Sequence, residues 1–561
     1  MKAESIQIHN FRTFADAEIG LSPYTLLVGA NNSGKSNVIE AIRVFYEKDI
    51  KFDESRDLPK FPTSDQDSWI EIQYRPLQEE FDALKEEYRQ SDGTYRVRKY
   101  LKTQELGSDG KVKSGIYAYV DGKPSDSRFY GEKSVQQGKL GDVIYIPAVS
   151  KLDEHTKLTG PSALKDLINT VLKKVIGSSP AYESLRTAFV EFSANLKSEE
   201  TDGESLAKLE AEITKEIEEW GTSFELSVNP ITPDELLKNL IGHSITDKRL
   251  DAPTDPRVCG QGFQRHLIFT LIRLAAKYGS IPVTTRTDFS PTLTWILFEE
   301  PEGFLHPNQI EVLDANLRLL SGEDGSQVLI TSHNPSFVSR NIEDLPAMAR
   351  LHRPDKESKV GQISRTALDD ILKANQDCLT DWKVAGISVD DNDMRVEMES
   401  VKYALWLNPL RCCSVFANTV LLVEGPTETA LLGHMIASGK IRTPSGGGFV
   451  MDALGKYNMH RFMNLFGALG ISHAVLYDYD GGGTKSDAIA ATICNSQNAA
   501  TIGIDRFEND LEDFLGVSKP REARRKPQCL MWNLSEGGID NNRLRALAAK
   551  VESLLGVAHA P

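Results

Sequence analysis

Residues 24–45 read YTLLVGANNSGKSNVIEAIRVF, and this stretch decides the fold of the N-terminal half of the chain. An apolar strand pattern at residues 24–28 leads into a glycine-containing loop at 29–36, and a helical pattern follows at 37–45. A glycine-rich loop between a strand and a helix lets backbone N–H groups wrap phosphate oxygens. We therefore predict that this loop binds the phosphates of a nucleotide.

The loop residues have distinct expected roles. Gly29 and Gly34 supply backbone geometry that a side chain would obstruct. Lys35 is expected to contact the β- and γ-phosphates, and the Ser36 hydroxyl is expected to ligate Mg²⁺. Asn32 lies in the same loop and belongs to the predicted nucleotide-binding set. The expected ligand is ATP with Mg²⁺.

Two later strands end in polar residues that suit the same nucleotide. Residues 295–301, WILFEEP, read as a buried strand that ends in two carboxylates. Glu299 is expected to hold the Mg²⁺ shell and Glu300 to orient or activate the attacking water, although paired glutamates also commonly cap a helix. Residues 329–334, LITSHN, end the next strand. There His333 either senses the γ-phosphate or is an ordinary structural histidine.

A second acidic pattern lies near the other end of the chain. Residues 420–423 form an apolar strand that ends at Glu424, and Glu428 lies one turn into the following helix. A later buried strand ends at Asp478, and in an extended segment Asp480 points to the same side. Oxygen ligands without His or Cys favour Mg²⁺ or Mn²⁺ over zinc. A lone Asp-x-Asp is usually a turn, but two acidic strand ends in an α/β pattern favour a metal site.

The composition limits the kind of protein. The 64 basic and 80 acidic residues give a net charge of −16, which argues against a nonspecific basic coat for nucleic acid but permits a local basic groove. The densest basic run near the acids is at 519–526. We see no apolar run long enough for a membrane span and no secretory signal. The six cysteines lack metal-ligand spacing, so we expect a reducing, cytoplasmic location.

The order of the patterns predicts several domains. Alternating strands with Asp-Gly turns before residue 125 predict a meander, and residues 164–220 turn helical and charged. That helical stretch is either a dimerisation arm or a solvated insert. The chain then divides as follows: first ATPase segment, 1–150; helical insert, 151–245; second ATPase segment, 246–355; connecting segment, 356–413; and C-terminal domain, 414–561.

The N-terminal motifs resemble those of ABC-type ATPases, in particular the chromosome-maintenance and recombination branch. In that family an opening like IHNFR at 8–12, the P-loop, a signature, the Glu-Glu-Pro strand and a histidine switch recur in order. The resemblance places the signature at 260–265, where Gly262 and Gln264 would contact the nucleotide of a partner head, so that ATP closes a dimer. Gln261 stands where the family usually has Ser, and Phe263 where it often has Gly.

The C-terminal acids resemble those of the Toprim domain, and Toprim behind an ABC ATPase is typical of the OLD (overcoming lysogenization defect) endonucleases. The resemblance implies an α/β fold: an ABC-type P-loop ATPase with a helical insert, then a Rossmann-like Toprim domain. It also implies a two-metal site. In that site Glu428 and Glu512 form the second carboxylate set, and a lysine, Lys526 or its competitor Lys519, offsets transition-state charge.

The function implied by this resemblance is an ATP-controlled, divalent-metal-dependent DNA endonuclease in antiphage defence, with Glu424 and Asp478 at its catalytic centre. The implied partners are DNA and further copies of the chain. Some relatives also work beside a helicase or a retron reverse transcriptase with its DNA. The alternative is an ATP-gated sensor or scaffold that regulates a partner without cutting DNA. Gln261 and the acidic composition favour that alternative, and the intact acidic set opposes it. The ABC half disfavours a primase-like or topoisomerase-like enzyme.

Overall fold

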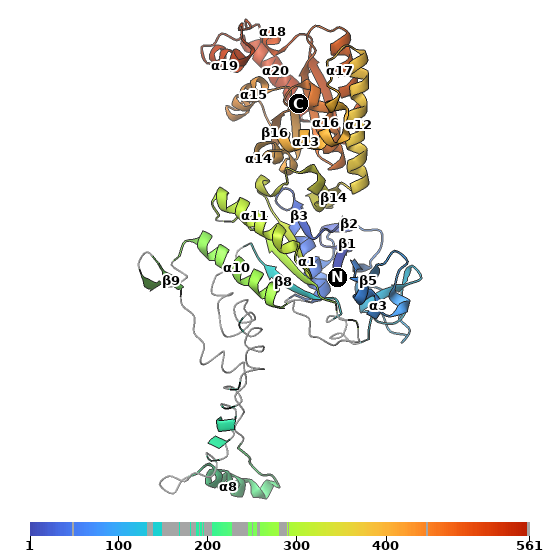
Figure 1. Ribbon diagram of the computed structural model, residues 1–561, viewed down its shortest axis with the longest axis vertical. Coiled ribbons are helices and arrows are strands. Elements are labelled where there is room, and N and C mark those ends of the chain that lie inside the picture. Colours follow the sequence, from blue (N-terminus) through green and yellow to red (C-terminus); the bar gives the residue numbers. More distant parts are fainter. Residues whose placement is uncertain are drawn as a thin grey trace. The chain divides into compact units, whose positions relative to one another are not determined.

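The computed structural model of the chain divides into two compact units, Met1–Ala148 with Thr284–Pro561, and Val149–Val283 (Figure 1). The structure describes these residues: 1–47, 50–131, 139–148, 205–226, 245–248, 251–254, 259–279, 289, 291–303, 305–444 and 447–557, together with 168, 180, 184, 187–189, 191, 192 and 195.

The first unit begins with an antiparallel sheet. Its strand order is β2 (Phe14–Gly20), β1 (Lys2–Phe11), β4 (Ser68–Arg75), β5 (Tyr95–Lys102), β6 (Gly115–Val120) and β7 (Lys123–Pro124). Strands β4, β5 and β6 pair in sequence order, which confirms the predicted meander. The short helices beside this sheet are α2 (Glu54–Asp57), α3 (Gln78–Ala83) and η1 (Glu86–Tyr88).

A second sheet carries the nucleotide-binding motifs. Its order is β14 (Lys359–Gln362), β13 (Met348–His352), β3 (Tyr24–Val28), β12 (Ser326–Thr331), β11 (Thr294–Glu299) and β8 (Asp142–Ile146). All neighbours are parallel except β13 and β14. The carboxyl ends of β3, β12 and β11 therefore meet at one edge, and helix α1 (Lys35–Tyr46) starts from that edge.

One hydrophobic core joins the two sheets. Ile6 and Tyr74 from the first sheet, Leu27 and Trp295 from the second, and Ile42 of α1 are all buried in it. Arg12, which ends the 8–12 motif, ties β1 to its neighbours through ion pairs with Glu40 and Asp57. Helix α11 (Pro307–Ser321) and the 3₁₀ turns η4 (Pro335–Phe337) and η5 (Ile342–Ala347) complete this region.

The segment that the sequence left as a weak connector is helical. Helix α12 (Arg365–Val384) is capped by Ser364, whose hydroxyl accepts from the Ala367 N–H at 3.1 Å, and it buries Leu368, Leu372 and Leu379 along one face. The remaining elements are η6 (Asn392–Met394), α13 (Val396–Trp406), α14 (Pro409–Cys412) and η7 (Cys413–Phe416). Helix α12 packs against α16 (Met459–Ala468) and α17 (Thr484–Asn495).

The C-terminal region holds a four-stranded parallel sheet in the order β16 (Gly448–Asp452), β15 (Thr419–Val423), β17 (Ser472–Asp478), β18 (Thr501–Phe507). The flanking elements not yet given are α15 (Pro426–Ala437), η8 (Lys456–Asn458), α18 (Leu511–Leu515), η9 (Ala523–Arg525), α19 (Lys526–Ser535) and α20 (Asn541–Leu554). Buried side chains of α15, α18, α19 and α20 share one core with β15 and β17. The predicted α/β class is confirmed.

The second unit contains the described residues of the predicted insert. Helix α8 (Leu206–Ile217) carries the predicted apolar repeat, and the other elements that the structure describes in this unit are η2 (Glu218–Trp220), the antiparallel strands β9 (Ile245–Asp247) and β10 (Ala252–Thr254), and α10 (Gln261–Gly279). Most of residues 164–204 lies outside the described residues, so the dimerisation arm stays a prediction. Across the residues described, no helix is long and apolar enough to cross a membrane.

Candidate nucleotide and metal-ion sites

The P-loop requires glycine at two positions. Gly29 has φ 144°, and a Cβ built there would lie 2.0 Å from the Leu351 carbonyl oxygen. Gly34 is the N-cap of α1 with φ 108°, and its Cβ would lie 2.8 Å from Ser358 Oγ. Both the left-handed backbone and the close neighbours exclude a larger residue. The loop geometry therefore explains why glycine is needed at both positions.

Lys35 is held inside the loop. Its Nζ donates to the carbonyl oxygens of Gly29 at 3.0 Å and Ala30 at 2.9 Å. Burial lowers the pKa of Lys35 to about 8, and the carboxylates of Glu300 and Glu302 partly oppose that shift. A phosphate would give the buried ammonium an anionic partner in place of carbonyls. Ser33 Oγ in the same loop is buried and has no hydrogen-bond partner among the residues that the structure describes, which also fits a phosphate ligand.

A cavity of about 300 Å³ brings most of the predicted nucleotide-binding residues together. Its lining includes Asn32, Gly34, Lys35, Ser36, Glu300 and His333. Glu299 does not line it, and its Oε2 accepts from the Tyr145 hydroxyl at 3.0 Å. Gly262 and Gln264 lie in α10 of the second unit, where the Gln264 side-chain amide donates to the Cys259 carbonyl at 2.7 Å.

Glu300 and His333 face each other across the cavity. His333 Nε2 lies 3.5 Å from Glu300 Oε1. Burial, and then the charge of Lys35, lower the pKa of His333, while Glu300 opposes this. The imidazole is therefore neutral at physiological pH. Glu300 has φ 44°, and its N–H donates to the Thr331 carbonyl at 2.9 Å, so the backbone fixes the start of its side chain.

A third glutamate, Glu302, lies two residues after Glu300, and the sequence did not indicate a role for it. Its Oε1 accepts from Ser332 Oγ and from the His333 N–H, both at 2.8 Å. Burial raises the pKa of Glu302. This carboxyl therefore positions the loop that carries His333. The only signal in the sequence was a third acid shortly after the Glu299–Glu300 pair.

The C-terminal acids gather at the carboxyl edge of the parallel sheet. Val423 of β15 pairs with Leu476 of β17, so Glu424 and Asp478 leave neighbouring strands at the same edge. Asp478 also pairs with Phe507, the last residue of β18, and Glu512 follows that strand at the start of α18. The topology thus brings acids from three separate stretches of sequence to one place.

The charges of these acids affect one another strongly. Asp478 is 8% exposed, and burial, followed by the charges of Glu428 and Glu424, raises its pKa to about 8. Burial also raises the pKa of Glu428 to about 7, with further contributions from Glu424 and Glu512. Burial is again the main reason why the pKa of Glu424 is raised. Such mutual destabilisation of negative charge is relieved by a bound cation.

Two oxygens in this cluster lack partners among the described residues. Glu424 Oε2 and Glu512 Oε1 are buried and accept no hydrogen bond from any part of the chain that the structure describes, whereas Glu428 Oε2 accepts from the Gly425 N–H at 3.0 Å. Among the residues that the structure describes, no three His, Cys, Asp or Glu side chains are arranged closely enough to enclose an ion. An ion would therefore have to draw the carboxylates together. The all-oxygen donors and the unpaired atoms fit a hard divalent cation.

Asp480 is placed differently from the sequence expectation. Strand β17 ends at Asp478, and Asp480 has φ 55°, so the two side chains do not share an extended segment. The expectation from strand alternation is therefore wrong. Asp480 instead forms an ion pair with Lys456, whose Nζ also donates to the Asp478 carbonyl at 3.0 Å. Lys456 is buried and was missed from sequence, where only its position after a strand at 448–452 hinted at the site.

The two candidate lysines contact different acids. Lys526 Nζ lies 3.3 Å from Glu512 Oε2. Lys519 forms an ion pair with Asp510, and the Asp510 carboxylate also caps α18 by accepting from the Asp513 N–H at 2.9 Å. Asp510 is therefore a further buried acid beside the cluster that sequence reasoning had not assigned.

Comparisons with known proteins match both halves of the chain. A family model described as AAA ATPase domain matches residues 1–241 and 165–338, and one described as overcoming lysogenization defect protein-like, TOPRIM domain, matches residues 415–480. The Old nuclease of Escherichia phage P2 is 24% identical over 552 residues, covering 92% of this chain and 86% of the relative.

Two other relatives are similar over comparable lengths. Endonuclease GajA of Bacillus cereus strain VD045 is 21% identical over 491 residues, covering 86% of this chain and 75% of the relative. The OLD nuclease of Thermus scotoductus is 21% identical over 498 residues, covering 85% and 81% respectively.

The fold, the acidic edge and these matches define a class: an ATPase domain joined to a TOPRIM domain in an ATPase-linked nuclease. The chain belongs to the AAA ATPase domain family and also carries an overcoming lysogenization defect (OLD) protein-like TOPRIM domain, and it is similar over most of its length to the Old and OLD nucleases. The resemblance seen in its sequence motifs is thereby confirmed.

Proposed function

We propose that the chain is an ATP-hydrolysing, divalent-metal-dependent DNA endonuclease whose ABC-type ATPase domain controls phosphodiester hydrolysis in the TOPRIM domain. One observation carries the proposal: Glu424, Glu428, Asp478 and Glu512 form an acidic cluster at the edge where three strands end. Burial raises the pKa of Glu424, Glu428 and Asp478, and two oxygens of the cluster are unpaired among the described residues. A structural role alone gives no reason to gather so many carboxyls in a site with so few cations.

In the nuclease site, Glu424, Asp478 and Asp480 would hold one ion, and Glu428 with Glu512 a second. Such ions, when bound, would supply the activation of the attacking water and the stabilisation of the leaving oxygen. The carboxyls of Asp478 and Glu428 would lose their protons when a cation binds, because the cation offsets their negative charge.

Lys526, beside Glu512, would supply positive charge where negative charge develops on the phosphate. The basic run at 519–526 would grip the DNA backbone beside that centre.

In the ATPase site, Lys35 would bind the β- and γ-phosphates, and Ser36 with Glu299 would hold Mg²⁺. Glu300 would orient the attacking water, and neutral His333 would donate a hydrogen bond toward the γ-phosphate. Gly262 and Gln264 would act on the nucleotide of a second copy of the chain, so a homodimer or a larger homo-oligomer belongs to the proposal. The domain limits predicted from sequence remain the working division of the chain.

The names of the relatives support the proposed cellular role. Old nuclease, Endonuclease GajA and OLD nuclease are all named as nucleases, and the first is that of a phage. We place this chain in cytoplasmic antiphage defence with DNA as its substrate, alone or beside a helicase or a retron reverse transcriptase with its DNA. The competing function is an ATP-gated sensor or scaffold that does not cut DNA, which the Gln261 departure in the signature and the acidic composition favour.

Plasmid nicking separates these functions. Purified full-length protein is incubated with supercoiled plasmid and Mg²⁺ or Mn²⁺, with and without ATP, beside Asp478→Asn and Lys35→Ala. Glu508→Gln is the matched control, because Glu508 also follows β18 but its side chain is 78% exposed. We expect nicking by the wild type and the control and none by Asp478→Asn. Nicking by the Asp478→Asn variant would contradict the assignment of the nuclease site. A wild type that does not cut under any of these conditions would favour the scaffold function.

A further inference from the structure

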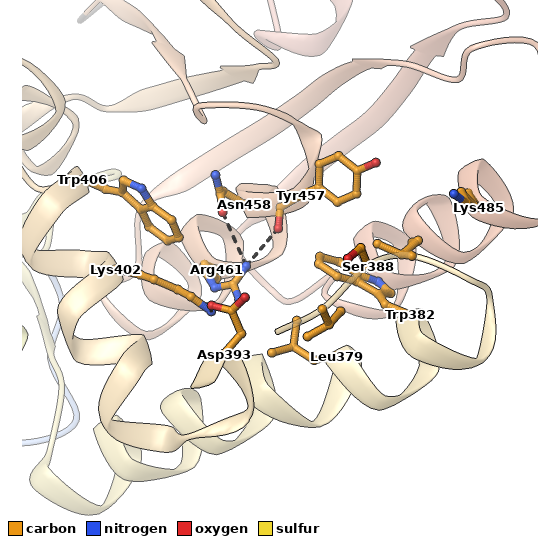
Figure 2. A pocket seen from close by; sticks show the side chains of 12 residues that line it. Leu379, Trp382, Ser388, Asp393, Lys402, Trp406, Tyr457, Asn458, Arg461 and Lys485 are labelled. Atoms are coloured by element: carbon orange, nitrogen blue, oxygen red, sulfur yellow. Dashed lines mark hydrogen bonds and ion pairs between the residues drawn. The ribbon is translucent and has the colours of Figure 1, made fainter. Parts of the chain in front are cut away.

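A second cavity is lined by residues of α12, α13, η8, α16 and the first turn of α17 (Figure 2). Its volume is about 470 Å³, within the range of about 300–1,000 Å³ typical of small-molecule sites. Some of its wall is apolar, from Leu379, Ile387 and Val389. No residue of the nucleotide or metal-ion sites described above lines it. The nucleotide and metal-ion sites therefore do not explain this cavity.

Aromatic rings form the sides of this cavity. Figure 2 shows Trp406 on one side and Trp382 on the other, with Arg461 between them. The Trp382 ring is fixed, because its Nε1–H donates to Thr492 Oγ1 at 2.8 Å and its face meets Tyr457 edge-on at 5.6 Å. Tyr457 is 43% exposed and Trp406 is half-buried. Rings that are anchored but partly exposed are suited to stacking on a planar ligand.

Positive charge predominates in the lining. Lys402, Arg461 and Lys485 line the cavity against a single carboxylate, Asp393. Lys402 lies 3.4 Å from Asp393 and 2.8 Å from the buried Glu399, which also holds Arg461 at 2.6 Å, so the charges of these two cations are largely offset. Lys485 is exposed and forms no ion pair within the stretches of the chain that the structure describes. The charge of Lys485 therefore favours an anionic group at its end of the cavity.

The cavity is connected to the acidic cluster through the backbone. Tyr457 directly follows Lys456, whose Nζ contacts Asp480 and the Asp478 carbonyl. On the other side, Lys485 lies in the first turn of α17, which begins after the glycine run 481–483 that follows Asp480. A ligand in the cavity would therefore lie against the two segments that leave the metal-ion site.

We propose that this cavity binds a nucleotide unit, with its base against Tyr457 and Trp406 and its phosphate toward Lys485. The shared chemistry is an aromatic base with a phosphate, and its source is either a nucleotide of the DNA strand or a free mononucleotide. The strand source rests on the proposed nuclease function, because it places the bound base next to the phosphate to be cut. The alternative is that the cavity is only loose packing between helices.

The test measures binding without catalysis. Full-length protein carrying Lys35→Ala, which removes the P-loop lysine, is titrated in EDTA by 2-aminopurine fluorescence. One arm uses the free 2-aminopurine deoxyribonucleoside monophosphate, and the other uses a short single strand that contains it. Tyr457→Ala, Tyr457→Phe and Lys485→Gln are compared with Lys440→Gln, which changes an exposed lysine outside the cavity.

We expect Tyr457→Ala to weaken binding about tenfold or more, the size of one base–aromatic contact, and Tyr457→Phe to retain it. Lys485→Gln should weaken binding and flatten its salt dependence, whereas Lys440→Gln should change neither. An effect in the monophosphate arm identifies a free nucleotide as a ligand, and an effect confined to the strand arm identifies the DNA strand.

Unchanged affinity for both ligands in Tyr457→Ala and Lys485→Gln would overturn the proposal. Lys485 is exposed, so its variant tests the cavity even if Tyr457→Ala does not fold. Because the assay needs no cutting, its result is independent of the Asp478→Asn nicking assay. Failure of the nuclease proposal and failure of this one are therefore distinguishable.

Discussion

Lys526 Nζ lies 3.3 Å from Glu512 Oε2. The other oxygen of this carboxylate, Oε1, is buried and has no hydrogen-bond partner among the described residues. Burial lowers the pKa of Lys526, but the nearby carboxylates of Glu512, Asp510 and Asp478 together outweigh burial, and the net shift is upward. Lys519 is more exposed and is paired with Asp510, which is also occupied in capping α18. The geometry thus separates two lysines that the sequence left in competition.

We expect Lys526→Ala to reduce the rate of DNA nicking by about 10²-fold or more, because removing one group that stabilises transition-state charge has an effect of this order. Lys519→Ala should reduce nicking much less, since its partner Asp510 lies beside the cluster. The measurement is the single-turnover nicking rate with Mn²⁺ at saturating protein. A larger loss in Lys519→Ala than in Lys526→Ala would reverse the assignment.

The raised pKa values predict how pH and metal act on stability. Asp478, with a pKa of about 8 against an ordinary 3.8, and Glu428, with about 7 against 4.5, bind protons more tightly when folded than when unfolded. The free energy of unfolding of the metal-free protein should therefore fall as pH rises from about 4 to about 8. Mg²⁺ or Mn²⁺ should raise the melting temperature more at high pH than at low pH, because the ion competes with protons.

Thermal melting across this pH range, in EDTA and with Mn²⁺, provides the measurement. Asp478→Asn with Glu428→Gln should flatten the pH slope and abolish the response to metal. Glu508→Gln, an exposed acid near the same strand end, should behave as the wild type does. An identical pH slope in the double variant would show that these two groups do not carry the linkage.

The features that the sequence predicted are those set by local pattern. The strand, loop and helix around Lys35, and the acids Glu424 and Asp478 at strand ends, follow from apolar periodicity and from the rule that parallel strands share an edge. The weak pattern at 351–408 concealed helix α12, because its apolar face is recognisable only once α16 and α17 cover it.

The features that the sequence could not predict depend on long-range pairing. Lys456 reaches Asp480 because β16 pairs with β15, which pairs with β17, and no local pattern records that order. Glu302 matters through its bonds to Ser332 and His333, which follow the neighbouring strand β12. Asp480 departs from the expected position because the chain turns at φ 55° before a glycine run, where alternation along a strand no longer applies.

We expect different variants of the ATPase site to impair ATP binding and ATP hydrolysis. Lys35→Ala should abolish the stabilisation of the protein by Mg²⁺–ATP, because the buried ammonium is the cation of the loop. Glu300→Gln should keep that stabilisation and reduce phosphate release by about 10²-fold, since an amide is a poor base for water. Melting temperature and phosphate release are the two readouts. Glu311→Gln, an exposed glutamate of α11, is the control and should change neither.

Arg350 connects the nucleotide-binding half of the first unit to its C-terminal half. It is 3% exposed, and its guanidinium donates to the carbonyl oxygens of Val415, Ala417 and Gly470, each at 2.9 Å. Burial lowers the pKa of Arg350 to about 10. Arg350 pairs with Val28 just before the P-loop, while Ala417 and Gly470 precede β15 and β17. One side chain thus links the nucleotide-binding sheet to the strands that carry the acids.

We expect Arg350→Met to destabilise the protein by about 3–5 kcal/mol, because three buried carbonyl oxygens lose their donors. Arg350→Lys should recover only some of this, since one ammonium cannot reach three diverging carbonyls in the geometry of the planar guanidinium. Arg353→Met, which removes a single bond to the Lys356 carbonyl, should stay within about 0.5 kcal/mol of the wild type. Urea unfolding gives these differences. Equal stability of Arg350→Met and Arg353→Met would mean that the three bonds do not hold the two halves together, whereas a selective loss in Arg350→Met that also weakens the metal response would tie this link to the acidic edge.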